Sequence, residues 1–372
     1  MHMNARYIAA LALVATSVTG IAQAEVEFYG HVNKATMIYD DGQDTEFNIV
    51  DNNMNRTMFG IAAEKDVHCG LTASALLEMD HVTNRSSSIT QNNVAGTQNT
   101  PAQANGGVNM RTARVGISGN WGGVFAGTQV TAIDDVFYRD LGPAANVIGP
   151  GVSAFGGGVQ FRDNAGALQA LGGTALTPSN MTLGFNGDLE IADTIQYNTP
   201  VFEGFNASIS AQQGGNIDTA LRYEGEYEGF KVDSAIGMAF ENDDATAAND
   251  ELDTTLQAAL SVAHESGIAG TVSYVKQSLD NKTAGVEDPM GYYVKLGYAW
   301  DNYGVAIDYS KFNDPITTAA TDNELSSYGV GGQVDMGHGV SLGAMYRIYE
   351  ADVTGVSLDD IKVGAMTMKV KF

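Results

Sequence analysis

The stretch from Thr131 to Phe185 reads TAIDDVFYRDLGPAANVIGPGVSAFGGGVQFRDNAGALQALGGTALTPSNMTLGF, 55 residues without a strand or helix period. Three of the seven prolines lie in it, and only six of its residues are charged. In a compact soluble domain, a loop of this length would leave backbone amides without partners. A closed β-barrel with a wet interior removes the problem, because the loop can fold inward, bond to water and wall, and narrow the lumen. The stretch therefore predicts a barrel built around it.

The first 24 residues have the pattern of a secretory signal peptide. Arg6 provides the positive end, Ile8 to Val18 the apolar run, and Ala22-Gln23-Ala24 a small-residue cleavage site. The apolar run is too short for a spanning helix, so the mature chain is expected to begin near Glu25 after export. Beyond it no run of 18 apolar residues occurs. The mature chain is then either soluble or crosses a membrane as strands.

The mature chain is strongly acidic. Without Arg6, the 19 basic residues become 18 against 44 acidic ones, a formal net charge of −26. This charge argues against nucleic acid as a partner. It fits either a soluble or salt-adapted surface or an electric field that favours cations. A single cysteine, Cys69, excludes an internal disulfide framework.

Strand patterns begin directly after the cleavage site. A first strand is expected over 26–39, followed by an acidic loop over 40–52 that is more simply a solvated rim than a calcium site, because its spacing fits no EF-hand. A second strand is expected over 53–66 with Arg56 on its polar face. The strand over 110–119 is expected to place Met110, Thr112 and Arg114 inward.

The loop over 131–185 is called the insertion below. After it, polar and apolar residues alternate with period two, and charges fall on one face only. One face of the strand over 221–228 carries Leu221, Tyr223 and Tyr227, and the other carries Arg222, Glu224, Glu226 and Glu228. Lys295 likewise opposes apolar neighbours such as Val294 and Leu296.

Alternation alone does not separate a soluble sandwich from a membrane barrel, but connection lengths do. Short turns and long loops mostly alternate along the chain, and the loop over 40–52 counts as a long one. This gives 16 strands with both termini on the short-turn side. Aromatic residues sit at strand ends, and the last strand ends on Phe372. Pairing of the last strand with the first would leave no open edge. The expected fold class is all-β, a 16-stranded antiparallel transmembrane β-barrel with an inward-folding constriction loop over 131–185 and a single domain over 25–372.

Several motifs resemble those of Gram-negative general diffusion porins. The motifs are Phe28-Tyr29-Gly30, Val115-Gly116-Ile117-Ser118-Gly119, Trp121-Gly122-Gly123, Gly127-Thr128-Gln129, Ile195-Gln196-Tyr197-Asn198-Thr199-Pro200, Gly204-Phe205 and the terminal Phe372. The resemblance covers essentially the whole mature chain.

The resemblance implies a homotrimer in which the third long loop, here 131–185, folds into each pore. It also implies acidic loop residues opposite a basic ladder on the wall. The candidate pore-constriction residues are Arg56, Arg114, His31, Asp134, Asp135, Asp140 and Arg139. The loop carboxylates are expected to face Arg56 and Arg114. The chain departs from the family pattern around Gly127, where Phe125 and Thr128 stand in place of the usual arginines, and this weakens the ladder.

Each candidate also has a structural reading: the arginines as solvated wall residues, and the loop carboxylates as anchors that accept hydrogen bonds from the wall. No nucleophile-elbow context, closely spaced His/Cys pair or phosphate-binding Gly-Lys-Ser/Thr run is present, so neither enzymatic activity nor a cofactor is expected. The resemblance implies passive diffusion of small hydrophilic solutes across the outer membrane, among its lipids and lipopolysaccharide. The acidic net charge and the missing arginines predict a preference for cations. Two alternatives stay open: a channel selective for a sugar, phosphate or organic acid, and a plugged structural or adhesive barrel.

Overall fold

The computed structural model describes residues 25–91, 107–183, 191–242 and 250–372. The expected signal peptide, residues 1–24, and the last two residues of the expected loop lie outside these ranges. The strands are β1 (Glu25–Asp40), β2 (Thr45–Asp51), β3 (Met58–Val67), β4 (Leu71–Val82), β5 (Gly107–Gly119), β6 (Gly122–Val130), β7 (Ala170–Leu171), β8 (Thr174–Ala175), β9 (Ile191–Asn198), β10 (Phe205–Gln212), β11 (Ile217–Tyr227), β12 (Phe230–Phe240), β13 (Glu251–His264), β14 (Ile268–Asp280), β15 (Met290–Trp300), β16 (Tyr303–Asn313), β17 (Asn323–Gly337), β18 (Val340–Val353) and β19 (Ile361–Lys371). Short 3₁₀ turns occupy His68–Gly70, Ser86–Ser88 and Val152–Ala154. In the described part of the chain, no helix has the length and apolar character needed to cross a bilayer.

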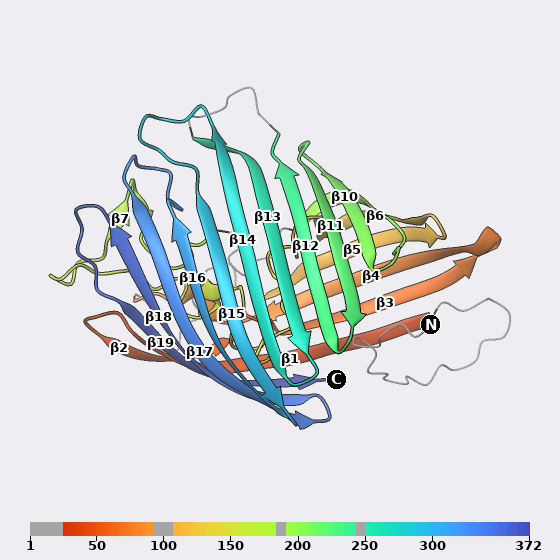
Figure 1. Cartoon of the computed structure of the whole chain (residues 1–372), viewed down its shortest axis with the longest axis horizontal. Helices are drawn as coiled ribbons and strands as arrows, with labels where there is room; N and C mark the ends of the chain where they lie inside the picture. The colour runs from red at the N-terminus through yellow and green to blue at the C-terminus, as the bar shows by residue number, and fades with distance from the viewer. Residues whose placement is uncertain (1–24, 92–106, 184–190, 243–249) are drawn as a thin grey trace.

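Within the described ranges, seventeen antiparallel strands form one sheet that closes on itself where β1 pairs with β19. The strands β2 and β3 both pair with β1, β2 with its second half and β3 with its first. Together they make one crossing of the wall, so the barrel has 16 crossings, as the sequence predicts. Figure 1 shows these strands tilted around the barrel in chain order, with β1 against β19. Closure leaves no unpaired edge in the wall, which a bilayer requires.

The predicted acidic loop over 40–52 is wrong. The chain turns within four residues, and β2 begins at Thr45. The Asp41 carboxylate accepts hydrogen bonds from the amides of Gln43 (3.1 Å) and Asp44 (2.9 Å), and Gly42 adopts a positive φ of 89°. An aspartate that bonds to the amides just after it is a turn-former, and glycine supplies the left-handed conformation that such a turn needs. The acidic run is therefore a tight hairpin.

The predicted inward position of Met110 is also wrong. Met110 pairs with Met79 and is exposed on the outer face, while Thr112 pairs with Glu78. A β-bulge between these pairs inserts Arg111 as an extra residue, which reverses the parity of everything before it on β5. Thr112 and Arg114, after the bulge, keep their predicted inward side.

The outer face is apolar, with aromatic rings at the short-turn ends of the strands. Trp300 stacks between Tyr298 and Tyr303, at ring-centroid distances of 5.7 Å each. Phe28 at the start of the chain stacks on Phe372 at its end, with centroids 6.1 Å apart. Aromatic side chains favour the boundary between lipid and water. This belt of aromatic residues therefore marks one edge of the membrane-spanning band.

The interior is not lined by polar groups throughout. A buried apolar cluster joins the insertion to the inner wall, with Phe155 and Phe161 from the insertion and Tyr39, Tyr293 and Tyr349 from the strands. The hydroxyl of Tyr349 lies 2.6 Å from the carbonyl oxygens of Val152 and Phe155. Part of the lumen is therefore filled by packed side chains, because the insertion brings its own apolar residues to meet apolar residues on the wall.

Candidate functional site

The insertion follows the inner wall, and its backbone amides donate hydrogen bonds to polar wall side chains. The amide of Ala132 donates to Ser210 Oγ on β10 (2.9 Å), and that of Leu141 donates to Ser261 Oγ on β13 (2.8 Å). Between them the Phe137 amide donates to Gln257 Oε1 (3.2 Å). Inward-facing serine and glutamine thus satisfy backbone donors that would otherwise be buried without partners.

The loop carboxylates bind basic residues that sequence analysis did not select. Asp135 accepts hydrogen bonds from Arg222 on β11 (Nε to Oδ1, 3.0 Å) and pairs with Arg139. Asp140 accepts from Lys295 on β15 (2.6 Å) and from Thr271 on β14 (2.8 Å).

The partners of Asp135 and Asp140 therefore come from β11, β14 and β15 rather than from Arg56 and Arg114. Asp134 is buried at 2% exposure. Strand parity had already placed Arg222 and Lys295 on polar faces, and this was the available signal for them.

The basic candidates sit on the wall made by β3, β4 and β5. Arg56, just before β3, lies 3.3 Å from Asp80, and Arg85 lies 3.8 Å from the same carboxylate. The bulge at Arg111 adds a third guanidinium, close enough to act electrostatically on Arg56. Arg85 and Arg111 were missed, since one follows a strand end and the other depends on a bulge that no period reveals.

Arg114 and His31 both face inward, closer to the short-turn end of the barrel than Arg56. Arg114 lies over the Phe125 ring, 4.7 Å from its centroid, and donates to Gln129 Oε1 at 3.0 Å. Phe125 thus occupies the lumen side and holds the guanidinium against the wall by a cation–π contact. His31 on β1 is opposite Lys371 on β19 and is 9% exposed.

Arg139 bridges the insertion to the wall at the edge of the open lumen. Its guanidinium lies 3.2 Å from Glu224 on β11 and 3.3 Å from Asp233 on β12. The Arg139 side chain is only 12% exposed, whereas that of Asp135 is 49% and that of Glu224 is 71% exposed. Asp135 and Glu224 therefore reach further into solvent than the guanidinium does, whereas Asp233, at 16%, is nearly as covered as Arg139.

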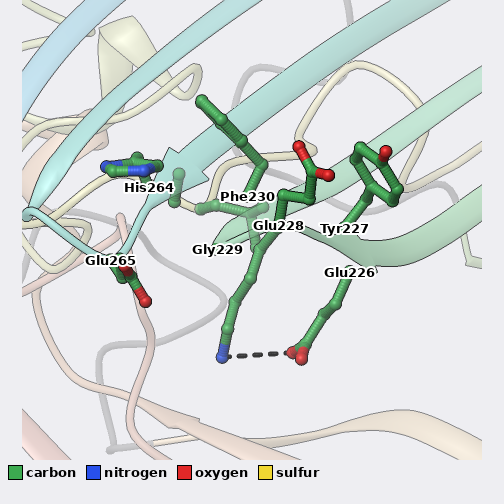
Figure 2. Close-up of a pocket in the computed structure, with 10 residues that line it drawn as sticks. Glu226, Tyr227, Glu228, Gly229, Phe230, His264 and Glu265 are labelled. Carbon is green, nitrogen blue, oxygen red and sulfur yellow. Dashed lines mark ion pairs between the residues drawn. The ribbon is translucent and has the colours of Figure 1, made fainter.

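Beside this network, a pocket of about 530 Å³ opens between the insertion and the short turns. Leu141 lines it from the insertion, and the β11–β12 turn and the end of β13 supply the rest. Figure 2 shows Glu226, Glu228 and Glu265 around it, with the ion pair between Glu226 and Lys231 (3.3 Å). Its rim is predominantly acidic.

A second part of the insertion, 159–177, reaches the long-loop end of the barrel. Arg162 Nε donates to Asp41 in the β1–β2 turn at 2.7 Å. Burial by itself would raise the pKa of the Asp41 carboxyl, but hydrogen bonds from the Asp44 and Gln43 amides and from Arg162 outweigh it and hold this pKa below its usual value. Gly172, beside the small hairpin β7–β8, packs closely on Thr318 in the loop after β16.

The described residues contain no group of three or more His, Cys, Asp or Glu side chains that could hold a metal ion.

Comparison with known proteins gives a family and a fold. A family model described as Gram-negative porin matches residues 9–354. An anion-selective porin from Comamonas acidovorans superposes with a TM-score of 0.64 at 16% identity, covering 94% of this chain and all of that one. OmpT of Vibrio cholerae in a trimer form gives 0.58 at 13% identity, with 94% and 100% covered. OmpF of Salmonella typhi gives 0.59 at 14% identity, with 94% and 98% covered. No curated protein sequence matches the chain.

Proposed function

The chain belongs to the Gram-negative porin family, and from this premise we propose that its pore prefers cations to anions. As a family member, it is a diffusion channel of the outer membrane, through which small hydrophilic solutes and ions pass down their gradients. Solute choice in such a channel follows from pore size and from the field of charges along the lumen. The proposal concerns that field.

One observation carries the preference: lumen carboxylates are exposed where their basic partners are covered. Glu224 and Asp135 expose 71% and 49% of their side chains, while Arg139 and Arg222 expose 12% and 14%. The ion pair on the β3–β5 wall does not share this pattern, since Arg56 is 8% and its partner Asp80 is 2% exposed. A permeating ion interacts most strongly with charges that project into the water, so the exposed carboxylates attract cations more than the covered guanidinium groups attract anions. The acidic pocket in Figure 2 extends the same field to the short-turn end.

Two observations oppose the proposal. Four arginines, Arg56, Arg85, Arg111 and Arg114, lie on or beside the β3–β5 wall. The superposed porin from Comamonas acidovorans is anion-selective, although at 16% identity the likeness shows the fold alone. The selectivity is therefore expected to be modest.

Reversal potentials in planar bilayers under a salt gradient test the proposal. The wild-type channel is expected to favour potassium over chloride. The double variant Glu224→Gln/Glu226→Gln should lower the permeability ratio by roughly half. Asp352→Asn, on the outer face of β18, is the matched control and should leave the ratio unchanged. A wild-type preference for chloride would overturn the proposal.

The roles of the individual constriction residues are part of the proposal. Asp135, Arg139 and Arg114 would border the open passage, Arg56 would act from within the wall beside it, and Asp134 and Asp140 would chiefly anchor the loop. His31 would line the wall below it. The support is the exposure and partners of each side chain given above.

We also propose a homotrimer in contact with outer-membrane lipids and lipopolysaccharide, formed by a single domain over 25–372 after removal of residues 1–24. The loop over 131–185 would be the constriction. Support comes from the family and from the belt of aromatic residues on the outer face. No enzymatic role is proposed, since porin family members act as channels.

A further inference from the structure

Five inward-facing glycines lie under the insertion, one on each of five strands. They are Gly237 on β12, Gly297 on β15, Gly304 on β16, Gly331 on β17 and Gly343 on β18. None has a positive φ, so the backbone conformation does not require glycine at any of them. Glycine inside a strand weakens it, because it adds chain entropy and packs no side chain. Their presence at these five positions therefore calls for another cause.

The cause is space for the insertion. A Cβ built on Gly297 would lie 2.6 Å from Pro143 Cδ, and one on Gly304 would lie 2.6 Å from Pro143 Cβ. The same construction on Gly331 meets Ile148 Cγ1 at 2.6 Å.

At the two ends of the row the fit is similar. On Gly343 a Cβ would lie 2.8 Å from Val147 Cγ1. On Gly237 it would lie 3.0 Å from both Val136 Cγ2 and the carbonyl oxygen of Thr219 on β11, and 3.1 Å from Ile133, so here the wall and the insertion share the contact. Each glycine is thus a hollow filled by a side chain of the insertion.

The hollows fix the depth of the loop. Packed interiors resist compression, so a side chain seated in a hollow holds its backbone at a set distance from the wall. The loop is also tied by hydrogen bonds to Ser210, Gln257 and Ser261 and by the Asp140–Lys295 ion pair (2.6 Å). Contacts of these two kinds, along an arc from β10 to β18, leave the loop from Ala132 to Ile148 little freedom to move.

We propose that these five glycines, the glycine track, determine the size of the pore. They set how far the insertion projects into the lumen and hold it as a fixed insert, not a gate. This goes beyond the proposed cation preference, because it concerns the width of the passage and not its charge.

The test compares two adjacent glycines on β17. Gly331 faces the insertion, whereas Gly332 faces outward, where a Cβ would meet no atom closer than 3.4 Å. Gly331→Val should change single-channel conductance by roughly a third, because added bulk displaces Ile148. Gly332→Val should leave it unchanged. The double variant Gly331→Val/Ile148→Ala should return the conductance to within about a tenth of wild type, because the smaller loop side chain makes room for the valine.

A conductance change at Gly331 that the second substitution reverses supports the proposal. An unchanged conductance in Gly331→Val overturns it, as does a change that Ile148→Ala does not reverse. If Gly331→Val does not fold, Gly343→Ala with Val147→Ala provides the same comparison at lower strain. The reversal potential should stay the same in all these variants. A wild-type preference for anions would thus defeat the charge proposal without touching this one, which only the conductances can defeat.

Discussion

Two ion pairs lie on the inner face of the barrel, Lys231–Glu226 and Arg347–Asp308. The first is exposed to solvent and the second is buried. The Lys231–Glu226 distance is 3.3 Å, with 45% and 56% of the side chains exposed. The Arg347–Asp308 distance is 2.6 Å, with 1% and 0% exposed. The buried pair also bonds to Ser327 and Tyr293, and Tyr293 belongs to the apolar cluster shared by the insertion and the wall.

This difference shows that the inner face of the barrel has two environments. On β11 and β12 it carries exposed charges, which under the proposed cation preference act on permeating ions. On β15 to β18 it carries a closed ion pair, together with glycines and apolar side chains that pack on the insertion. Strand alternation is the same in both regions, and the insertion contacts both. They differ in how completely the insertion and its apolar cluster cover the wall.

The largest expected effect is at the buried pair. Arg347→Met should destabilise the folded barrel by about 3–5 kcal/mol, because it leaves the Asp308 carboxylate buried without its partner. Denaturant unfolding in detergent, followed by intrinsic fluorescence, would measure it. The double variant Arg347→Met/Asp308→Leu should recover much of the loss. A loss below about 1 kcal/mol for Arg347→Met would remove the distinction between the two regions.

A smaller effect is expected where the insertion is tied to the wall. Asp140→Asn leaves the Lys295 ammonium buried with a weaker partner and should cost about 1–3 kcal/mol. Limited chymotrypsin digestion should then cleave the insertion faster at Phe137 or Tyr138. The matched variant is Asp135→Asn, whose side chain is 49% exposed and which should be cleaved more slowly than Asp140→Asn. Equal cleavage of the two would show that burial of the anchor does not matter.

The outer contact of the insertion should depend on pH. The Asp41 carboxyl has a pKa lower in the folded state than its usual value, so its stabilising effect is complete above the unfolded pKa of about 3.9 and is lost as pH falls through the lower folded pKa. When the pH falls from about 5 to about 2, the melting temperature of wild type should therefore drop more than that of Asp41→Asn. If the melting temperatures of the two proteins fall equally with pH, the Asp41 carboxylate does not stabilise the fold through this contact.

The smallest effect is expected at the pair in water. Lys231→Met should change the free energy of unfolding by less than about 1 kcal/mol, because solvent screens the pair and its side chains lose entropy when they meet. The same substitution should shift the reversal potential toward cations, since it removes a positive charge beside Glu226. A stability loss comparable to that of Arg347→Met would show that exposure is not the controlling variable.

Much of the fold follows from local rules in the sequence. The last strand pairs with the first, Phe372 stacks on Phe28, and Arg222 and Lys295 face inward as their parity predicts. Two failures have local causes that period-two reasoning does not include. An aspartate–glycine turn shortened the predicted loop over 40–52, and a bulge at Arg111 turned Met110 outward.

The candidate site was predicted in part. Sequence reasoning selected Asp135, Asp140 and Arg139 from the insertion, but not Arg222 and Lys295 as their partners. The roles of all the candidates in permeation stay predictions. The glycine track was not recognised at all, because glycines in a strand pattern look the same whether they face lipid or a loop.

The sequence by itself determined a closed barrel with an insertion too long and aperiodic for anything else, because alternation and turn chemistry act between neighbours in the chain. Only the tertiary structure decided which part of the inner wall the insertion covers. That choice depends on the fit of Pro143, Val147 and Ile148 into hollows on strands more than 150 residues away in the chain. Such a fit is a property of three-dimensional packing, which no local period encodes.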